Sequence, residues 1–118
     1  MAKTPFRAEV KAYPEVVQID MHGEINAFAD NAINVAYTQA EALNPTTIVL
    51  NFEDVDYINS TGIALIVGML AQARKAHRRL AVYGLSDHYM EIFQITRLAD
   101  FMTIYPDQQS ALAGRETV

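Results

Sequence analysis

Residues 46–79 read TTIVLNFEDVDYINSTGIALIVGMLAQARKAHRR and decide the fold. The segment begins with the apolar strand pattern Ile48-Val49-Leu50, passes through an acidic link at 53–56 and reaches Asn59-Ser60-Thr61-Gly62 just before a long helical pattern. A short apolar strand that leads into a helix is typical of α/β sheets with parallel crossovers. The sequence therefore predicts a buried strand and its crossover helix at the centre of the domain.

The helical pattern after Gly62 has two apolar sides. Spacing of i, i+3, i+4 and i+7 predicts a core-facing stripe. This stripe comprises Ile63, Ile66, Val67, Leu70 and Ala73. The outward side comprises Leu65, Met69, Gln72 and Ala76 and is less polar than a solvated helix face. Two interpretations of the outward side remain open: a second helix of the domain covers it, or it binds a partner.

The junction between strand and helix carries the candidate functional residues. Asn59 and Ser60 are both good N-cap residues, because a short side-chain oxygen accepts a hydrogen bond from a first-turn amide. Ser60 and Thr61 would then lie at the positive end of the helix dipole. A phosphate attached there would meet free amides, so we expect the site to tolerate the added charge.

The segments on either side complete a mixed sheet. Residues 6–22 alternate between apolar and polar side chains around the Pro14-Glu15 turn, which predicts an antiparallel hairpin. A helix is expected from 27 to 43, where Asn44-Pro45 ends it because proline disfavours helical geometry in the preceding residue. Its apolar stripe is expected on Phe28, Ala32, Val35, Ala36, Ala40 and Leu43.

The C-terminal third predicts two more strands and two more helices. A buried parallel strand is expected at 80–85, and Ser86 is expected to cap a third helix. That helix carries more apolar residues than one face can bury, so part of it is expected to line a groove or a contact surface. A last strand at 102–105 and a short helix at 107–112 follow. The fold class is thus α/β, a small mixed sheet packed with about four helices in one domain over 1–118.

Two motifs carry a resemblance to a known family. Val49-Leu50-Asn51-Phe52, followed by residues 57–66, resembles the core of a STAS domain. Gly23-Glu24-Ile25-Asn26 is similar to the Gly-Glu-Leu-Asp motif at the end of that family's second strand. The resemblance extends over nearly the whole chain, with a core at about 7–112. It implies the same mixed sheet that the residue patterns predict.

The resemblance implies a regulatory function. Such domains include bacterial anti-sigma-factor antagonists, which bind an anti-sigma factor with serine/threonine kinase activity and release the sigma factor. In these proteins the kinase phosphorylates the hydroxyl residue just before the glycine of the second motif, which corresponds here to Thr61, with Ser60 as the alternative. A PP2C-type phosphatase is the implied further partner. Asn26 and Asn59 stand where the family has aspartates, and both replacements remove a carboxylate.

The expected partner-binding surface joins both motifs to the outward side of the central helix. It comprises Gly23, Glu24, Ile25, Asn26, Asn59, Ser60, Thr61, Gly62, Leu65 and Met69. A second interpretation is a STAS subunit that works without phosphorylation, as a scaffold in a larger regulatory or lipid-transport assembly. Asparagine at 26 and 59 suits that interpretation, since it keeps the turn while losing the charge.

Composition and charge argue against several other classes of protein. The formal net charge of −5 argues against nucleic acid as a partner, because phosphate binding needs clustered Lys and Arg. The one basic cluster, at 74–79, is explained by the dipole of the helix that ends there. The sequence has no cysteine and no membrane-spanning apolar run. We therefore expect a cytoplasmic protein without a membrane partner, either a monomer or a weak dimer.

Catalysis and metal binding are not expected. A serine at a strand-to-helix turn is found in hydrolases, but Ile58 stands where their nucleophile motif requires a glycine. His22 lies near Asp20 and Glu24 in the sequence, an arrangement more typical of the polar face of a strand than of a metal site. No pattern for a cofactor is present. The sequence predicts a binding protein rather than an enzyme.

Overall fold

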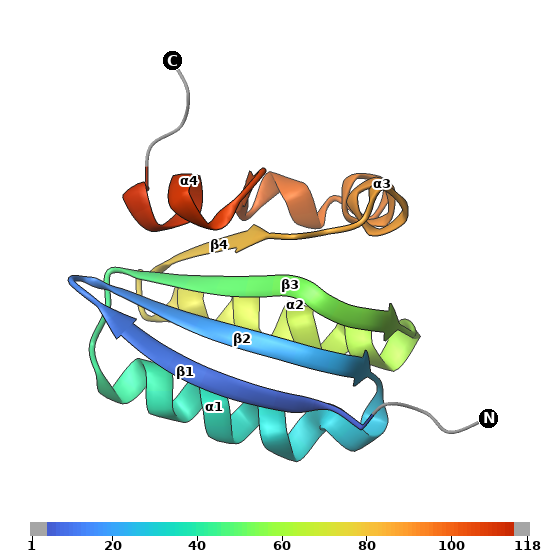
Figure 1. Ribbon diagram of the computed structural model, residues 1–118, viewed down its shortest axis with the longest axis horizontal. Coiled ribbons are helices and arrows are strands. Elements are labelled where there is room, and N and C mark those ends of the chain that lie inside the picture. The colour runs from blue at the N-terminus through green and yellow to red at the C-terminus, as the bar shows by residue number, and fades with distance from the viewer. Residues whose placement is uncertain (1–4, 115–118) are drawn as a thin grey trace.

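The computed structural model describes residues 5–114 and contains one five-stranded mixed sheet (Figure 1). The strands are β1 (Arg7–Tyr13), β2 (Val16–Ile25), β3 (Thr47–Ile58), β4 (Arg79–Tyr83) and β5 (Thr103–Tyr105). They are ordered β1-β2-β3-β4-β5, with β1 antiparallel to β2 and all other neighbours parallel. This arrangement confirms the predicted hairpin followed by parallel strands.

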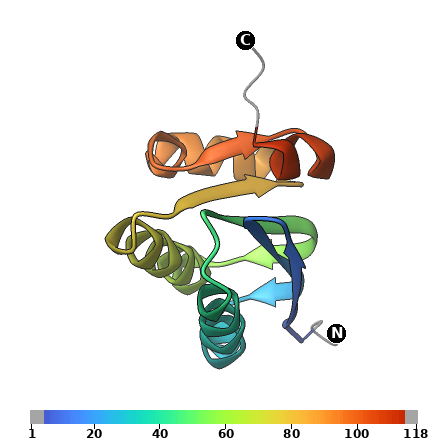
Figure 2. The ribbon, with the colours of Figure 1, turned by 90° about the vertical axis from the view of Figure 1, so that its left-hand side faces the viewer.

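Four α-helices cover the sheet, as predicted. They are α1 (Asp30–Ala42), α2 (Ser60–Lys75), α3 (Asp87–Ile95) and α4 (Gln108–Ala113), with 3-10 turns η1 (Ala27–Ala29) and η2 (Leu98–Asp100). The main core lies between the sheet and α1, α2 and α3. A smaller cluster on the other face packs Ala111 of α4 against Val49 and Tyr83. Figure 2 shows α2 and α4 on opposite sides of the sheet.

The β3 strand is longer than expected, because the acidic link predicted at 53–56 is part of it. Parallel pairing with β2 continues from Val16 opposite Thr47 to Ile25 opposite Ile58. Two irregularities in the register, after Asp20 and after Gly23, allow the strands to stay paired over this length. The extension carries the ends of both strands to the start of α2, where the two sequence motifs meet.

The predicted apolar stripe of α1 is confirmed at Ala36 and Ala40 and wrong at its large side chains. Phe28, Val35 and Leu43 are exposed, Phe28 at 94%. The buried face is completed by Ala29, Ile33 and Tyr37, which the predicted stripe did not contain. The chain passes through η1 before α1 begins at Asp30, and this changes which residues face the sheet. Phe28 is thereby left in solvent beside the first motif.

The predicted faces of α2 also need correction. Met69 was expected on the outward side but is only 2% exposed, whereas Val67 was expected in the core and is 43% exposed. The buried residues are Gly62, Ile66, Met69, Leu70 and Ala73. This set satisfies the helical spacing as well as the predicted set did, so periodicity alone does not distinguish them. Ile66, Leu70 and Ala73 are in the core as expected.

Candidate functional site

The two sequence motifs meet at the carboxyl ends of β2 and β3. Ile25 of the first motif pairs with Ile58 at the last position of the parallel ladder. The backbone N–H of Asn59 then donates to the carbonyl oxygen of Ile25 at 3.2 Å. From α3, the hydroxyl of Tyr89 accepts the N–H of Ile58 at 2.8 Å. The passage from β3 into α2 is therefore held by a backbone hydrogen bond from β2 on one side and by a tyrosine hydroxyl from α3 on the other.

Asn59 is the N-cap of α2. Its side-chain oxygen accepts the N–H of Gly62 at 2.8 Å, and its carbonyl accepts the N–H of Ile63 at 2.9 Å. Of the two caps that the sequence allowed, the structure thus uses Asn59 and not Ser60. Ser60 and Thr61 become the first two helical residues, and both are exposed. No acidic side chain lies in this first turn, so the dipole there is not neutralised by a carboxylate.

Gly62 is required by the close approach of α2 to β2. A Cβ atom at this position would collide with the carbonyl oxygen of Ile25 and lie 2.9 Å from Cγ2 of Ile58. Both neighbours belong to the paired ends of β2 and β3. The glycine therefore allows the two motifs to touch, which explains its position directly after the two hydroxyl residues.

Asn26 organises the neighbouring turn in the same way. Its side-chain oxygen accepts the N–H of Phe28 at 2.9 Å and caps η1, and η1 contacts α2. Phe28 is almost fully exposed, and Tyr57 at the end of β3 is 52% exposed. These two exposed aromatic rings adjoin the two motifs in the sequence, and exposed aromatic rings are candidate anchors for a protein interface. The expected partner surface did not include either ring. Their positions next to the two motifs in the sequence could have indicated that they belong to this surface.

The expected partner-binding residues differ widely in accessibility. Ser60 and Thr61 are exposed, while Glu24, Asn26, Asn59 and Leu65 are half-buried. Ile25 is fully buried in the main core, as is Met69, so their side chains cannot contact a partner. Gly23 and Gly62 are buried at the strand ends. The accessible part of the expected surface therefore consists of the two hydroxyl residues and the half-buried Glu24, Asn26, Asn59 and Leu65, with the exposed aromatics beside them.

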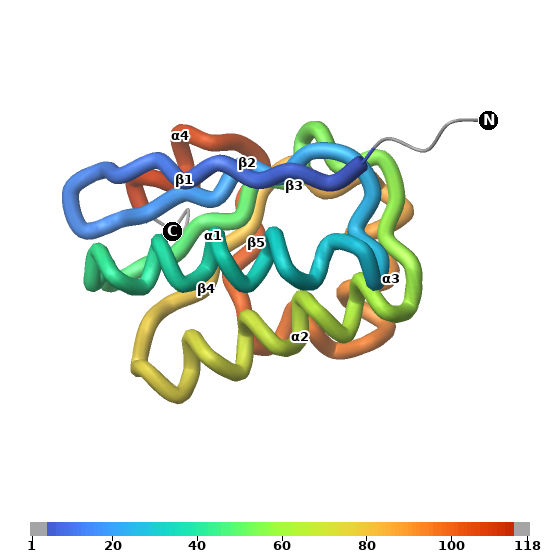
Figure 3. Tube along the Cα trace, turned by 90° about the horizontal axis from the view of Figure 1, so that it is seen from below, coloured from blue at the N-terminus to red at the C-terminus, as the bar shows by residue number. Residues whose placement is uncertain are grey.

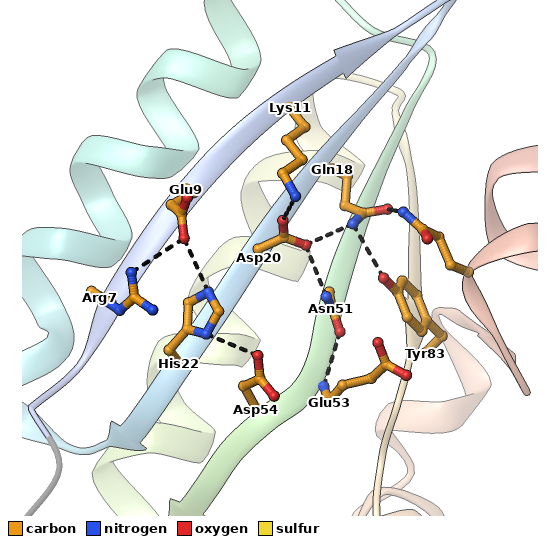
Figure 4. Close-up of polar contacts among 11 residues, drawn as sticks. Arg7, Glu9, Lys11, Gln18, Asp20, His22, Asn51, Glu53, Asp54 and Tyr83 are labelled. Carbon is orange, nitrogen blue, oxygen red and sulfur yellow. Dashed lines mark hydrogen bonds and ion pairs between the residues drawn. The ribbon is translucent and has the colours of Figure 1, made fainter.

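A separate polar cluster lies on the sheet, where the sequence predicted only the polar face of a strand (Figure 4). Asp20 is buried and accepts hydrogen bonds from Lys11 at 2.8 Å, Asn51 at 2.8 Å and Gln18 at 2.6 Å. Gln18 also donates to the Tyr83 hydroxyl at 3.1 Å. Burial alone would raise the pKa of the Asp20 carboxyl, but the hydrogen bonds from Lys11, Asn51 and Gln18 outweigh it and hold the pKa below its ordinary value. Asp20 therefore joins β1, β2 and β3 directly, and Gln18 extends the cluster to Tyr83 of β4.

His22 lies between acidic side chains of the two neighbouring strands. Its Nδ1 is 3.0 Å from Asp54 of β3 and its Nε2 is 3.2 Å from Glu9 of β1. Among residues 5–114 no group of three potential ligands is placed to hold a metal ion.

We expect acid to destabilise the protein through Asp20. Its pKa is lowered in the folded state, so below about pH 4 the unfolded chain binds more protons and the free energy of unfolding falls with pH. Asp20→Asn should flatten this dependence, as measured by urea unfolding at several pH values. Asp107, whose pKa is lowered by hydrogen bonds with Ser110, should preserve part of the slope. If Asp20→Asn lost stability with falling pH as steeply as the wild-type protein, the role given to Asp20 would be wrong.

Comparison with known proteins identifies the family of this chain. The model of the STAS domain family matches residues 7–111. An anti-sigma-B factor antagonist of Listeria monocytogenes is 28% identical over 88 residues, covering 75% of this chain and 77% of the relative. One from Staphylococcus aureus is 27% identical over 96 residues, covering 81% of this chain and 89% of the relative.

Solved structures show the same fold. An anti-sigma factor antagonist from Mycobacterium paratuberculosis superimposes with a TM-score of 0.81 at 19% identity, covering 96% of this chain and 97% of that one. The antagonist SpoIIAA in its unphosphorylated form has a TM-score of 0.70 at 22% identity, covering 93% and 96%. SpoIIAA has also been solved in its phosphorylated form. No helix between residues 5 and 114 is long and apolar enough to cross a membrane.

Proposed function

Because the chain belongs to the STAS domain family, we propose that it is an anti-sigma-factor antagonist, which binds an anti-sigma factor and thereby releases the sigma factor. The observation that carries this proposal is the exposure of Ser60 and Thr61 on the first turn of α2, beside the joined ends of β2 and β3. Relatives of that name support it, since each matches three quarters of the chain or more. In this role the protein binds and does not catalyse.

The proposed switch is phosphorylation of Thr61, the hydroxyl residue directly before Gly62. A phosphate at this position meets the first-turn amides of α2 and the positive end of its dipole, so the modified protein should remain folded. Ser60 is the alternative. Because Asn59 provides the cap, the Ser60 hydroxyl is not needed by the helix, and Ser60 is exposed like Thr61. The choice of Thr61 rests on the position that the family uses.

Release of the partner follows from the charge of the phosphate. At neutral pH a phosphate adds about −1.5 to −2 charges, and here it would lie on a surface that also presents Phe28 and Tyr57. A partner that buries these rings would have to desolvate the new charge. A hundredfold loss of affinity requires only about 2.7 kcal/mol. The proposed partner is an anti-sigma factor with serine/threonine kinase activity, opposed by a PP2C-type phosphatase in the cytoplasm.

A second candidate function is a STAS scaffold subunit that is not phosphorylated, in a larger regulatory or lipid-transport assembly. The capping geometry is compatible with this scaffold function. Asn26 and Asn59 each cap a helix with a side-chain oxygen that accepts one backbone N–H. An aspartate would form the same caps and add a negative charge, so the local fold does not need the carboxylates that are absent. In this case the same surface would bind a permanent partner.

We expect phosphate transfer to Thr61 when the protein is incubated with its cognate anti-sigma kinase and ATP. Phosphopeptide mass spectrometry should show labelling that Thr61→Ala abolishes and that Ser60→Ala, the matched control, retains. Thr61→Glu should bind the kinase at least about tenfold more weakly, whereas Thr61→Ala should bind persistently. Ser60→Ala should cost little stability, because Asn59 is the cap.

The alternative outcomes separate the hypotheses. Labelling that survives in Thr61→Ala and disappears in Ser60→Ala would move the acceptor by one residue. A wild-type protein that binds its kinase but is never labelled would contradict the switch and support the scaffold function. Absence of any binding to an anti-sigma factor would contradict the antagonist function itself.

A further inference from the structure

A groove runs along the C-terminal half of α2, far from Thr61. Its apolar part is a hollow of about 540 Å³ between α2 and the segment that follows α3. Leu70 and Leu98 form its buried floor, and the half-exposed Val67 and Phe101 form its sides. In Figure 3 this segment, drawn in orange, runs beside α2. The exposure of two large apolar side chains facing one hollow marks a candidate interaction surface.

The groove continues into a basic part of about 370 Å³, which shares Leu70, Arg74 and Phe101 with the apolar part. The guanidinium of Arg74 lies 5.0 Å from the centre of the Phe101 ring, at the boundary between the two parts. Arg79, at the start of β4, lines the basic part. An apolar hollow thus passes directly into a positively charged one.

The other charged residues of the basic part already have partners. Arg78 donates to the carbonyl of Pro45 at 2.5 Å, and its Nε lies 3.9 Å from Glu41. Asp100, the acidic residue of the lining, is paired with Arg97 at 2.7 Å. Within residues 5–114, Arg74 and Arg79 form no ion pair with a carboxylate. Their charges remain available to a ligand.

The charge of this groove is opposite to that of the whole protein. Residues 74–79 contain four of the chain's nine Lys and Arg residues, while the formal net charge is −5. Compensation of the α2 dipole explains why Arg74 and Lys75 are favourable in the last turn. It does not explain why Arg74 lies beside an apolar hollow. An acidic ligand would be repelled by most of the protein and attracted here.

We propose that this groove binds an acidic amphipathic segment of a partner protein. Apolar side chains of the segment enter the hollow over Leu70 and Leu98, and its carboxylates pair with Arg74 and Arg79. Arg74 is 13 residues beyond Thr61 on the same helix, which corresponds to about 20 Å. The surface is therefore distinct from the proposed phosphorylation site and can be occupied at the same time.

Two synthetic amphipathic peptides test the proposal: one with Leu on one helical face and Glu on the other, and one with Lys replacing every Glu. In titrations of the full chain followed by ¹H–¹⁵N NMR, the Glu peptide should shift the amides of Val67 to Arg74 and of 96–103. The Lys peptide should not bind. Arg74→Glu combined with Arg79→Glu should weaken binding of the Glu peptide at least tenfold, about 1.4 kcal/mol, and permit binding of the Lys peptide.

Lys75→Glu is the control, because it makes the same charge change as either arginine substitution alone, next to Arg74, at a residue that does not line the groove. An equal loss in this variant, or shifts located elsewhere, would overturn the proposal. Ala71 also lines the apolar hollow. Sedimentation that shows a dimer disrupted by Ala71→Glu would overturn the proposal, by assigning the groove to a second copy. Thr61→Glu should leave peptide binding unchanged, so failure here is distinguishable from failure of the proposed function.

Discussion

Gly62→Ala is expected to cost about 3 kcal/mol or more of the free energy of unfolding, at the upper end of the range for overpacked sites. The added methyl group would collide with the carbonyl oxygen of Ile25 and lie 2.9 Å from Cγ2 of Ile58. The carbonyl cannot move away freely, because it accepts the N–H of Asn59 and belongs to a paired strand. Relief of the collision would separate α2 from the end of β2 and so disrupt the site.

Gly68→Ala is the matched control, because Gly68 lies in the same helix and a Cβ there would have no neighbour within 4 Å. This substitution should stabilise the protein by up to about 1 kcal/mol, since alanine favours the helix over glycine. Urea unfolding of both variants at neutral pH measures the difference. Equal effects of the two substitutions would show that α2 does not approach β2 as closely as described.

Met69→Glu is expected to unfold the domain or to leave it barely stable. The side chain is only 2% exposed and belongs to the main core. The substitution removes apolar packing worth about 2–5 kcal/mol and adds a carboxylate with a further desolvation cost. Domains of this size are stable by only about 5–15 kcal/mol in total. Far-UV circular dichroism during heating should show a large loss of the folded state.

Val67→Glu provides the comparison for Met69. Both native residues are apolar and lie in α2, but Val67 is 43% exposed and its glutamate would remain in water. We expect the variant to fold with a change within about 1 kcal/mol. If Val67→Glu unfolded the protein while Met69→Glu did not, Val67 rather than Met69 would belong to the core, as the sequence pattern predicted.

The order and type of the elements were predictable because each has a local signal. The Pro14-Glu15 turn separates β1 from β2, Asn44-Pro45 follows α1, and Ser86 caps α3 by accepting the N–H of Tyr89. The phase of α1 and α2 was not predictable. Both helices carry apolar residues around much of their circumference, and only contact with the sheet selects Met69 over Val67 or Ala29 over Phe28.

The residues of the candidate site could be proposed from the sequence, but their arrangement in space could not. The two motifs identify the ends of β2 and β3, and capping chemistry limits the N-cap to Asn59 or Ser60. The choice of Asn59 depends on how β3 enters α2, which no local pattern specifies. The buried cluster around Asp20 was missed for a different reason. Gln18 alternates with apolar residues as an exposed side chain would, yet Tyr83 and Gln108, from distant parts of the chain, cover it.

The contact of Ile25 with Asn59 and Gly62 bears on how fast the proposed phosphorylation could release a partner. If Thr61 is phosphorylated as proposed, the charge would be added to a helix end that is already fixed by the backbone of a paired strand. The proposed switch would then need no rearrangement of the domain, and its effect would follow directly from the changed surface. The time between phosphorylation and release would then be set by the dissociation rate of the partner. The loss of affinity would be set by the residues around the Thr61 hydroxyl. Single substitutions on this surface could therefore change the affinity for the partner without lowering the stability of the domain.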